Sequence, residues 1–255
     1  MSQDEYSRIQ HEVPYVYKIQ NRTQILYYFG ERHSRDPNDE QWTKAKQMWN
    51  EFVEKTNNQK RVVLFEGGNS YKRNDEVEAI TEAGGTGFIT YLASKQNIEV
   101  FCPEPDRKYE YDELEKSFSR EEIEYYYFAR IVAQWWRNQD PKPEFEKYIA
   151  HYLKRDEEKS SWKDFDFSLD GMKKIHKNLF NTEFNLDDRN FFSKIASPVG
   201  TETIVNKVCR ASGDVREECI TKKIFEYWDN GYSIFIEYGS GHAVREEPLL
   251  REKLL

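Results

Sequence analysis

Three apolar segments of this chain each stop at a short turn that carries a histidine or a glutamate. Thr23–Phe29 (TQILYYF) leads into GERH, Arg61–Phe65 ends in EGG, and Tyr232–Tyr238 (YSIFIEY) ends in GSGH. Arg61–Phe65 contains the continuous apolar run VVLF, which is typical of a strand covered on both faces, as in parallel sheets. The sequence therefore predicts a sheet in which the segments between the strands cover both faces.

Helical patterns lie between the expected strands. The segment SRDPNDEQWTKAKQMWNEFVEKT has apolar residues at helical spacing, with Asp36 or Asn38 as the expected cap and Pro37 near the first turn. A second helix is expected at about residues 87–95, and a third strand at 98–102. Repeated strand-then-helix units predict an α/β fold, with a mostly parallel sheet of βαβ units and right-handed crossovers.

The middle of the chain has a different pattern. From about residue 112 to 188 it consists of charged, aromatic-rich segments with helical spacing and without strand periodicity. We expect a large helical insertion within a single α/β domain that spans residues 1–255. Such an insertion is a natural lid or substrate wall. Its YYYF and WW runs are typical of packing rather than of a cofactor site.

Charge and hydropathy exclude several classes of protein. The formal net charge of −8 disfavours non-specific binding of nucleic acid, because phosphates reward a basic surface. The sequence contains no apolar run of the ~20 residues that a membrane span requires. Three cysteines, an odd number without a CxxC pair, predict reduced thiols and a cytoplasmic protein. The sequence leaves the oligomeric state open.

The strand ends carry the residues best suited to chemistry. His33 lies in GERH, Glu66 in EGG and His242 in GSGH. Side chains at the carboxyl ends of parallel strands converge on one crevice, although they are far apart in sequence. Two imidazoles and a carboxylate can hold one divalent metal, such as Mn, Co, Zn or Fe, and a water bound to it. Without a metal the same groups can act as a general base and its partner, and the sequence leaves both mechanisms open.

Four short motifs resemble a known superfamily. FGERHS, LFEGG, DDRNFF and YGSGHAV occur in this order, with the helical insertion before DDRN. This pattern is similar to the superfamily of erythromycin esterases, ChaN-like proteins, TraB and the Tiki proteases, which share two GxxH motifs, a strand-end carboxylate and a late-helix arginine. The resemblance implies that His33 and His242 are the paired histidines, Glu66 the carboxylate and Arg189 the arginine. Glu31 is similar to the GExH form of the esterase and ChaN branches.

We therefore expect a hydrolase that activates water against an ester, amide or related bond in a small-molecule or peptide substrate. Arg189 would stabilise negative charge on the substrate, and Tyr238 and Ser240 border His242 as further candidates for substrate binding. One alternative is a metal- or haem-binding protein of the ChaN-like type without turnover. Another is an interaction protein that uses the aromatic insertion, with Trp135 and Trp136 as its working surface.

Overall fold

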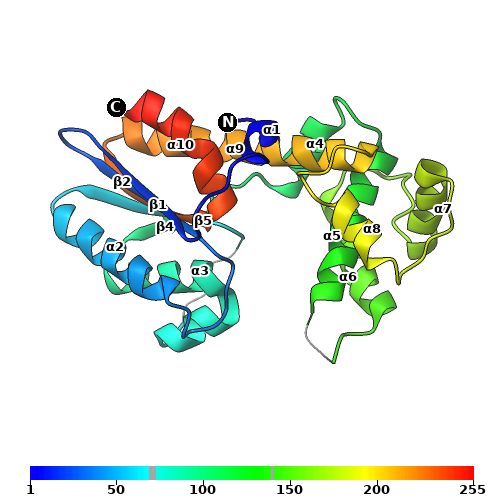
Figure 1. Ribbon diagram of the computed structural model, residues 1–255, viewed down its shortest axis with the longest axis horizontal. Coiled ribbons are helices and arrows are strands. Elements are labelled where there is room, and N and C mark those ends of the chain that lie inside the picture. Colours follow the sequence, from blue (N-terminus) through cyan, green and yellow to red (C-terminus); the bar gives the residue numbers. More distant parts are fainter. Residues whose placement is uncertain (69–72, 139–140) are drawn as a thin grey trace. The chain divides into compact units, whose positions relative to one another are not determined.

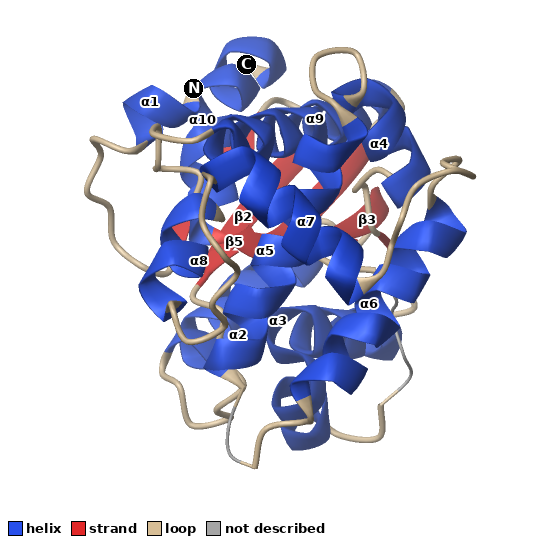
Figure 2. Cartoon of the chain, turned by 90° about the vertical axis from the view of Figure 1, so that its right-hand side faces the viewer, coloured by secondary structure: helices blue, strands red, loops and turns tan. Residues whose placement is uncertain are grey.

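The computed structural model describes residues 1–68, 73–138 and 141–255. The chain divides into two compact units (Figure 1). The first comprises residues 1–104 and 217–255, and the second comprises residues 105–216. All strands among the described residues, red in Figure 2, belong to the first unit. The α/β class predicted from the sequence is confirmed, and the helical segment expected at about 112–188 lies within the second unit, which extends beyond it at both ends.

The first unit contains a five-stranded sheet in the order β1-β2-β5-β3-β4. β2 pairs with β5, β5 with β3 and β3 with β4 in parallel, whereas β1 pairs with β2 antiparallel. The sheet is thus mostly parallel, as predicted, with β5 at its centre. The strands are β1 (Tyr15–Gln20), β2 (Ile25–Glu31), β3 (Lys60–Phe65), β4 (Glu99–Phe101) and β5 (Tyr232–Gly239).

Helices cover both faces of this sheet (Figure 1). α2 (Gln41–Lys55) and α3 (Glu76–Lys95) pack on one face, and the end of α9 (Ile204–Asp229) packs with α10 (Ser240–Leu254) on the other. Successive residues of a strand point to opposite faces. The continuous apolar runs therefore fill two cores at once, which explains why every residue of β2 is buried.

Some elements differ from the sequence-based expectation. α2 begins at Gln41, because Asp36–Asp39 form a hydrogen-bonded turn before it. α3 begins at Glu76 and is interrupted at Gly84, whose φ of 58° is open mainly to glycine. β1 was not predicted, although its alternating buried residues Tyr17 and Ile19 are the pattern of an edge strand. The short helix α1 (Gln3–Tyr6) precedes it.

The second unit is helical. α5 contacts α6, α7 and α8, and its YYYF run, Tyr125–Phe128, is fully buried in an aromatic core, as expected for packing residues. Asp188 caps α8 by accepting a hydrogen bond from the Phe191 amide. The helices of this unit are α4 (Arg107–Leu114), α5 (Arg120–Arg137), α6 (Phe145–Lys159), α7 (Leu169–Phe180), α8 (Arg189–Ile195) and the first part of α9.

Among the described residues, no helix has both the length and the apolar character that crossing a membrane requires.

Candidate functional site

The carboxyl ends of β2, β3 and β5 bring His33, Glu66 and His242 together. Because β5 lies between β2 and β3, the Glu66 carboxylate reaches across to the end of β5, where its Oε2 accepts a hydrogen bond from the Gly239 amide at 2.7 Å. His33 Nε2 lies 3.9 Å from Glu66 Oε2, and His242 Nε2 lies 3.8 Å from Glu66 Oε1. Each imidazole therefore faces a different oxygen of the same carboxylate.

A second glutamate lies behind each histidine. Glu31 Oε1 is 2.9 Å from His33 Nδ1, and Glu217 Oε1 is 2.7 Å from His242 Nδ1. A carboxylate at Nδ1 favours the tautomer that carries its proton there and directs Nε2 toward the reacting groups. The side chain of His33 is 69% exposed and that of His242 is 16% exposed, so His33 is the more accessible of the two.

A second pair of glutamates, Glu237 and Glu246, is fully buried behind Glu31 and Glu217. Glu237 is within hydrogen-bonding reach of Glu31, and Glu246 is within reach of Glu217. Burial, and then the charges of Glu31 and Glu66, raise the pKa of Glu237 well above its usual value. Burial and the charge of Glu217 do the same to the pKa of Glu246, which also accepts a hydrogen bond from the Tyr28 hydroxyl at 2.9 Å. The raised pKa favours the protonated form of each inner glutamate, in which it can donate a hydrogen bond to the glutamate in front of it.

The two middle glutamates differ in their surroundings. Burial raises the pKa of Glu31 and outweighs the opposing contact with His33. Burial acts on Glu217 too, but the contact with His242 and the charge of Arg245, whose Nη1 lies 3.1 Å from Glu217 Oε1, lower its pKa overall. The site thus consists of two Glu–Glu–His chains, which meet at Glu66.

Two glycines, Gly85 and Gly239, leave space for side chains of the Glu–Glu–His chain that contains His33. A Cβ atom at Gly85 would lie 2.3 Å from both Glu31 Oε2 and Glu237 Oε1, and one at Gly239 would lie 2.8 Å from His33 Nε2. Gly85 follows the interruption of α3 at Gly84, where the helix passes close to the buried carboxyl pair. Close approach of side chains, rather than a sharp turn, is what requires glycine at these two positions.

A pocket of about 440 Å³ opens beside the exposed histidine. This size is within the range of roughly 300–1,000 Å³ that is typical of small-molecule sites. The pocket therefore gives a substrate access to His33 and Glu66. It is lined by Glu31, His33, Ser34, Arg35, Glu66, Ala83, Gly84 and Thr86.

The other predicted site residues have different surroundings. Arg189 belongs to the helical unit, where its guanidinium lies 3.7 Å from the centre of the Trp136 ring, so its place in the cleft stays a prediction. Tyr238 is fully buried in the core under α10, with its ring edge-on to His242 at 5.3 Å, a position that favours packing over substrate contact. Ser240 is partly exposed and begins α10.

The donor atoms fit a divalent cation. Ligand atoms of Glu217, His242 and Glu246 all lie within 4.8 Å of one another. The predicted ligands His33, Glu66 and His242 are not gathered as closely, because the two imidazoles approach different oxygens of Glu66, at 3.9 and 3.8 Å. Among the described residues, Glu217 Oε2 and Glu246 Oε1 are buried without a hydrogen-bond partner. Imidazole and carboxylate are common ligands of divalent metals. His242 is shared by both groups.

No family model matches the chain, and neither the curated proteins nor the solved structures contain a significant match. The assignment of function therefore depends on the geometry of the site itself.

Sequence reasoning missed four of the site residues. Glu237 had a signal, because a glutamate inside the apolar strand YSIFIEY is unusual and predicts a special environment. Glu246 lies four residues after His242, which places both on one face of a helix. Glu217 and Arg245 had no such signal, since charged residues are common on exposed helices.

Replacement of Glu237 by Gln tests the neutral state of the inner carboxyl group. The raised pKa means that the folded state binds a proton that the unfolded state releases above roughly pH 4.3. This contribution is fully present below that pH, and the wild-type protein loses it as the pH rises toward the folded-state pKa, by at most about 1.4 kcal/mol per pH unit. A neutral Gln has no such loss. The free energy of unfolding is measured with urea from pH 5 to 8. As the pH rises through this range, the value for Glu237→Gln should increase relative to the value for wild type.

The exposed Glu99 of β4 supplies the control. Glu99→Gln makes the same substitution on the surface, where a change usually alters the free energy of unfolding by less than about 0.5 kcal/mol. Parallel stability curves for wild type and Glu237→Gln would show that Glu237 is ionised in the folded protein.

Proposed function

We propose that the strand-end site is the active site of a hydrolase, which activates water against an ester, amide or related bond of a small-molecule or peptide substrate. The observation that carries this proposal is the pair of Glu-backed histidines that flank one carboxylate beside an accessible pocket. An imidazole held at Nδ1 by a carboxylate is the arrangement that general-base catalysis requires.

His33 is the general base of the proposed reaction. Its Nδ1–H is donated to Glu31, so Nε2 holds the lone pair and lies next to the pocket. Water loses a proton to Nε2 as its oxygen bonds to the substrate carbonyl carbon. The imidazolium then returns that proton to the leaving group as the bond to it breaks. Glu31 stabilises the imidazolium, and the burial of Glu31 strengthens this interaction.

Glu66 and His242 complete the site. The Gly239 amide fixes the Glu66 carboxylate between the two imidazoles, where its charge stabilises a protonated histidine on either side. Glu217, itself paired with Arg245, orients His242. A divalent ion held by these imidazoles and carboxylates would polarise the substrate carbonyl and lower the pKa of a bound water.

The test is hydrolysis by wild type and His33→Ala. The substrates are p-nitrophenyl acetate, p-nitrophenyl butyrate and fluorogenic peptide amides. Loss of the general base should reduce kcat/KM by about 10²- to 10⁴-fold. The fold should be retained, because His33 is largely exposed, and circular dichroism and thermal melting check this.

His151→Ala is the matched control, since His151 is an exposed histidine on α6 in the other unit. It should hydrolyse the same substrates as well as wild type does. Equal rates for wild type and His33→Ala would overturn the assignment of His33. A stoichiometric metal, found by elemental analysis in a protein that hydrolyses none of the panel, would favour the metal-binding alternative.

A further inference from the structure

The helical unit contains a second pocket, which is lined by arginines. It has a volume of about 270 Å³ and lies along α5, between residues from α4 and α6. Four of its eight lining residues are arginine, in a chain whose formal net charge is −8. The residues are Arg107, Tyr127, Arg130, Ile131, Gln134, Arg137, Tyr152 and Arg155.

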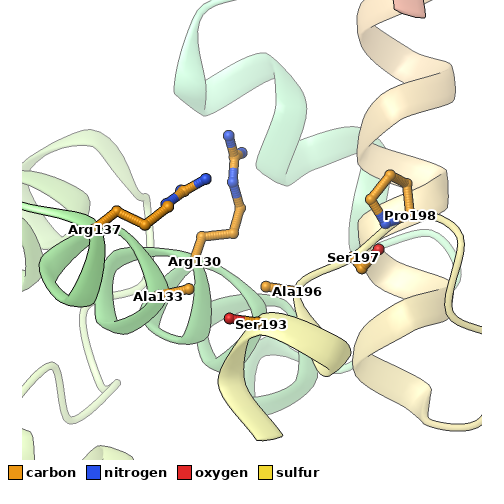
Figure 3. Close-up of a pocket in the computed structure, with 7 residues that line it drawn as sticks. All are labelled: Arg130, Ala133, Arg137, Ser193, Ala196, Ser197 and Pro198. Carbon is orange, nitrogen blue, oxygen red and sulfur yellow. The ribbon is translucent and has the colours of Figure 1, made fainter. Parts of the chain in front are cut away.

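Two of these arginines come from one face of α5. Arg130, Gln134 and Arg137 are spaced four and three residues apart, so their side chains follow one another along the helix. Figure 3 shows the guanidinium groups of Arg130 and Arg137 reaching out on the same side of α5. The same two arginines also line a neighbouring pocket of about 370 Å³, together with the hydroxyl-bearing residues Ser193 and Ser197.

The charges in this pocket are only partly balanced. Arg107 lies 3.2 Å from Glu110 and 3.9 Å from Asp156, and Arg155 lies 3.0 Å from the same Asp156. Among the described residues, neither Arg130 nor Arg137 forms an ion pair with a carboxylate. Two exposed arginine residues thus line the pocket next to two partly buried ones, and the local charge is positive.

Aromatic rings and buried acids hold the partly buried arginines in place. The Arg107 guanidinium lies 3.8 Å from the centre of the Tyr127 ring, and that of Arg155 lies 4.7 Å from the centre of the Tyr152 ring. Asp156, which contacts both arginines, is itself buried. Stacking and pairing of this kind fix the direction of the remaining N–H donors before a ligand arrives.

We propose that this arginine pocket binds a small molecule that carries two or more phosphate groups. The planar guanidinium group donates two parallel hydrogen bonds to phosphate, which makes arginine the preferred residue for this ligand. A single phosphate would engage only part of the lining, whereas a chain of phosphates can reach from Arg107 and Arg155 to Arg130 and Arg137. The adjoining pocket, with Ser193 and Ser197, extends the same surface.

Isothermal titration calorimetry on the full chain tests the proposal. Inorganic tripolyphosphate, ATP and orthophosphate are titrated separately at low ionic strength. Tripolyphosphate should bind with a stoichiometry of one and more tightly than orthophosphate. If ATP binds as tripolyphosphate does, the pocket recognises the phosphate chain alone, and if ATP binds more tightly, the nucleoside is also recognised. Either result supports the proposal.

Variants locate the site. Arg130→Gln combined with Arg137→Gln should weaken tripolyphosphate binding by about tenfold for each guanidinium lost. Lys173→Gln combined with Lys177→Gln removes the same charge from α7, where both lysines pair with acids outside the pocket, and should leave binding unchanged. No heat of binding from tripolyphosphate, or equal weakening in both double variants, would overturn the proposal. Because binding rather than turnover is measured, this result is separate from the proposed hydrolase activity.

Discussion

Glu66→Gln should reduce kcat/KM on the substrate of the proposed hydrolase by about 10³-fold, within the range that general acid–base groups contribute. Gln has nearly the same size, and its amide oxygen can still accept the hydrogen bond from the Gly239 amide. The substitution removes only the negative charge, which lies 3.8–3.9 Å from both imidazole Nε2 atoms. A protonated His33 or His242 would then lose the charge that stabilises it.

Steady-state kinetics at several pH values checks this prediction. Glu99→Gln serves as the control, because Glu99 is an exposed glutamate on a neighbouring strand of the same sheet. Its kinetics should equal those of wild type. If Glu66→Gln turned over substrate at the wild-type rate, the charge on Glu66 would have no part in the reaction, and the site would need another centre.

Gly85→Ala should lower the free energy of unfolding by about 1–3 kcal/mol, the usual cost of forcing an extra group into a packed core. The sign is informative, since Gly to Ala inside a helix ordinarily stabilises by up to about 1 kcal/mol. Here the new Cβ would lie 2.3 Å from Glu31 Oε2 and from Glu237 Oε1. These buried carboxyl groups have little room to move, so α3 or the pair itself must shift. Displacement of Glu31 would also release His33, and turnover should fall with stability.

Urea unfolding at pH 7 measures the change. Gly241→Ala is the comparison, because its Cβ would meet only the Tyr6 side chain, with the hydroxyl 3.0 Å away at the end of a side chain that can adjust. This variant should be close to wild type in stability. A Gly85→Ala protein as stable as Gly241→Ala would mean that the carboxyl pair is not packed against α3.

The two predictions test two properties of the same site, the charge of Glu66 and the space that Gly85 leaves. Glu66 is where the two Glu–Glu–His chains meet, and Gly85 is where the fold makes room for one of them. Burial raises the pKa of both inner glutamates and so favours their neutral form, which limits the negative charge within the site. Arg245 offsets part of what remains at Glu217.

The sequence by itself determined the α/β class and the positions of His33, Glu66 and His242. The continuous apolar runs of β2, β3 and β5 require cover on both faces, and residues directly after parallel strands must lie at one edge of the sheet. These conclusions follow from local pattern and strand direction alone. The antiparallel β1 was missed, although its alternating pattern was present in the sequence.

Only the tertiary structure decided what surrounds those residues. Glu217 reaches His242 from α9, and Gly85 reaches the Glu31–Glu237 pair from α3, through packing between elements that no local pattern specifies. The raised pKa of Glu237 likewise depends on burial and on neighbouring charges, which exist only in the folded chain. The positions of the parallel strands can be read from short segments of sequence, whereas strand order, pKa values and the fit of side chains depend on contacts between residues far apart in it.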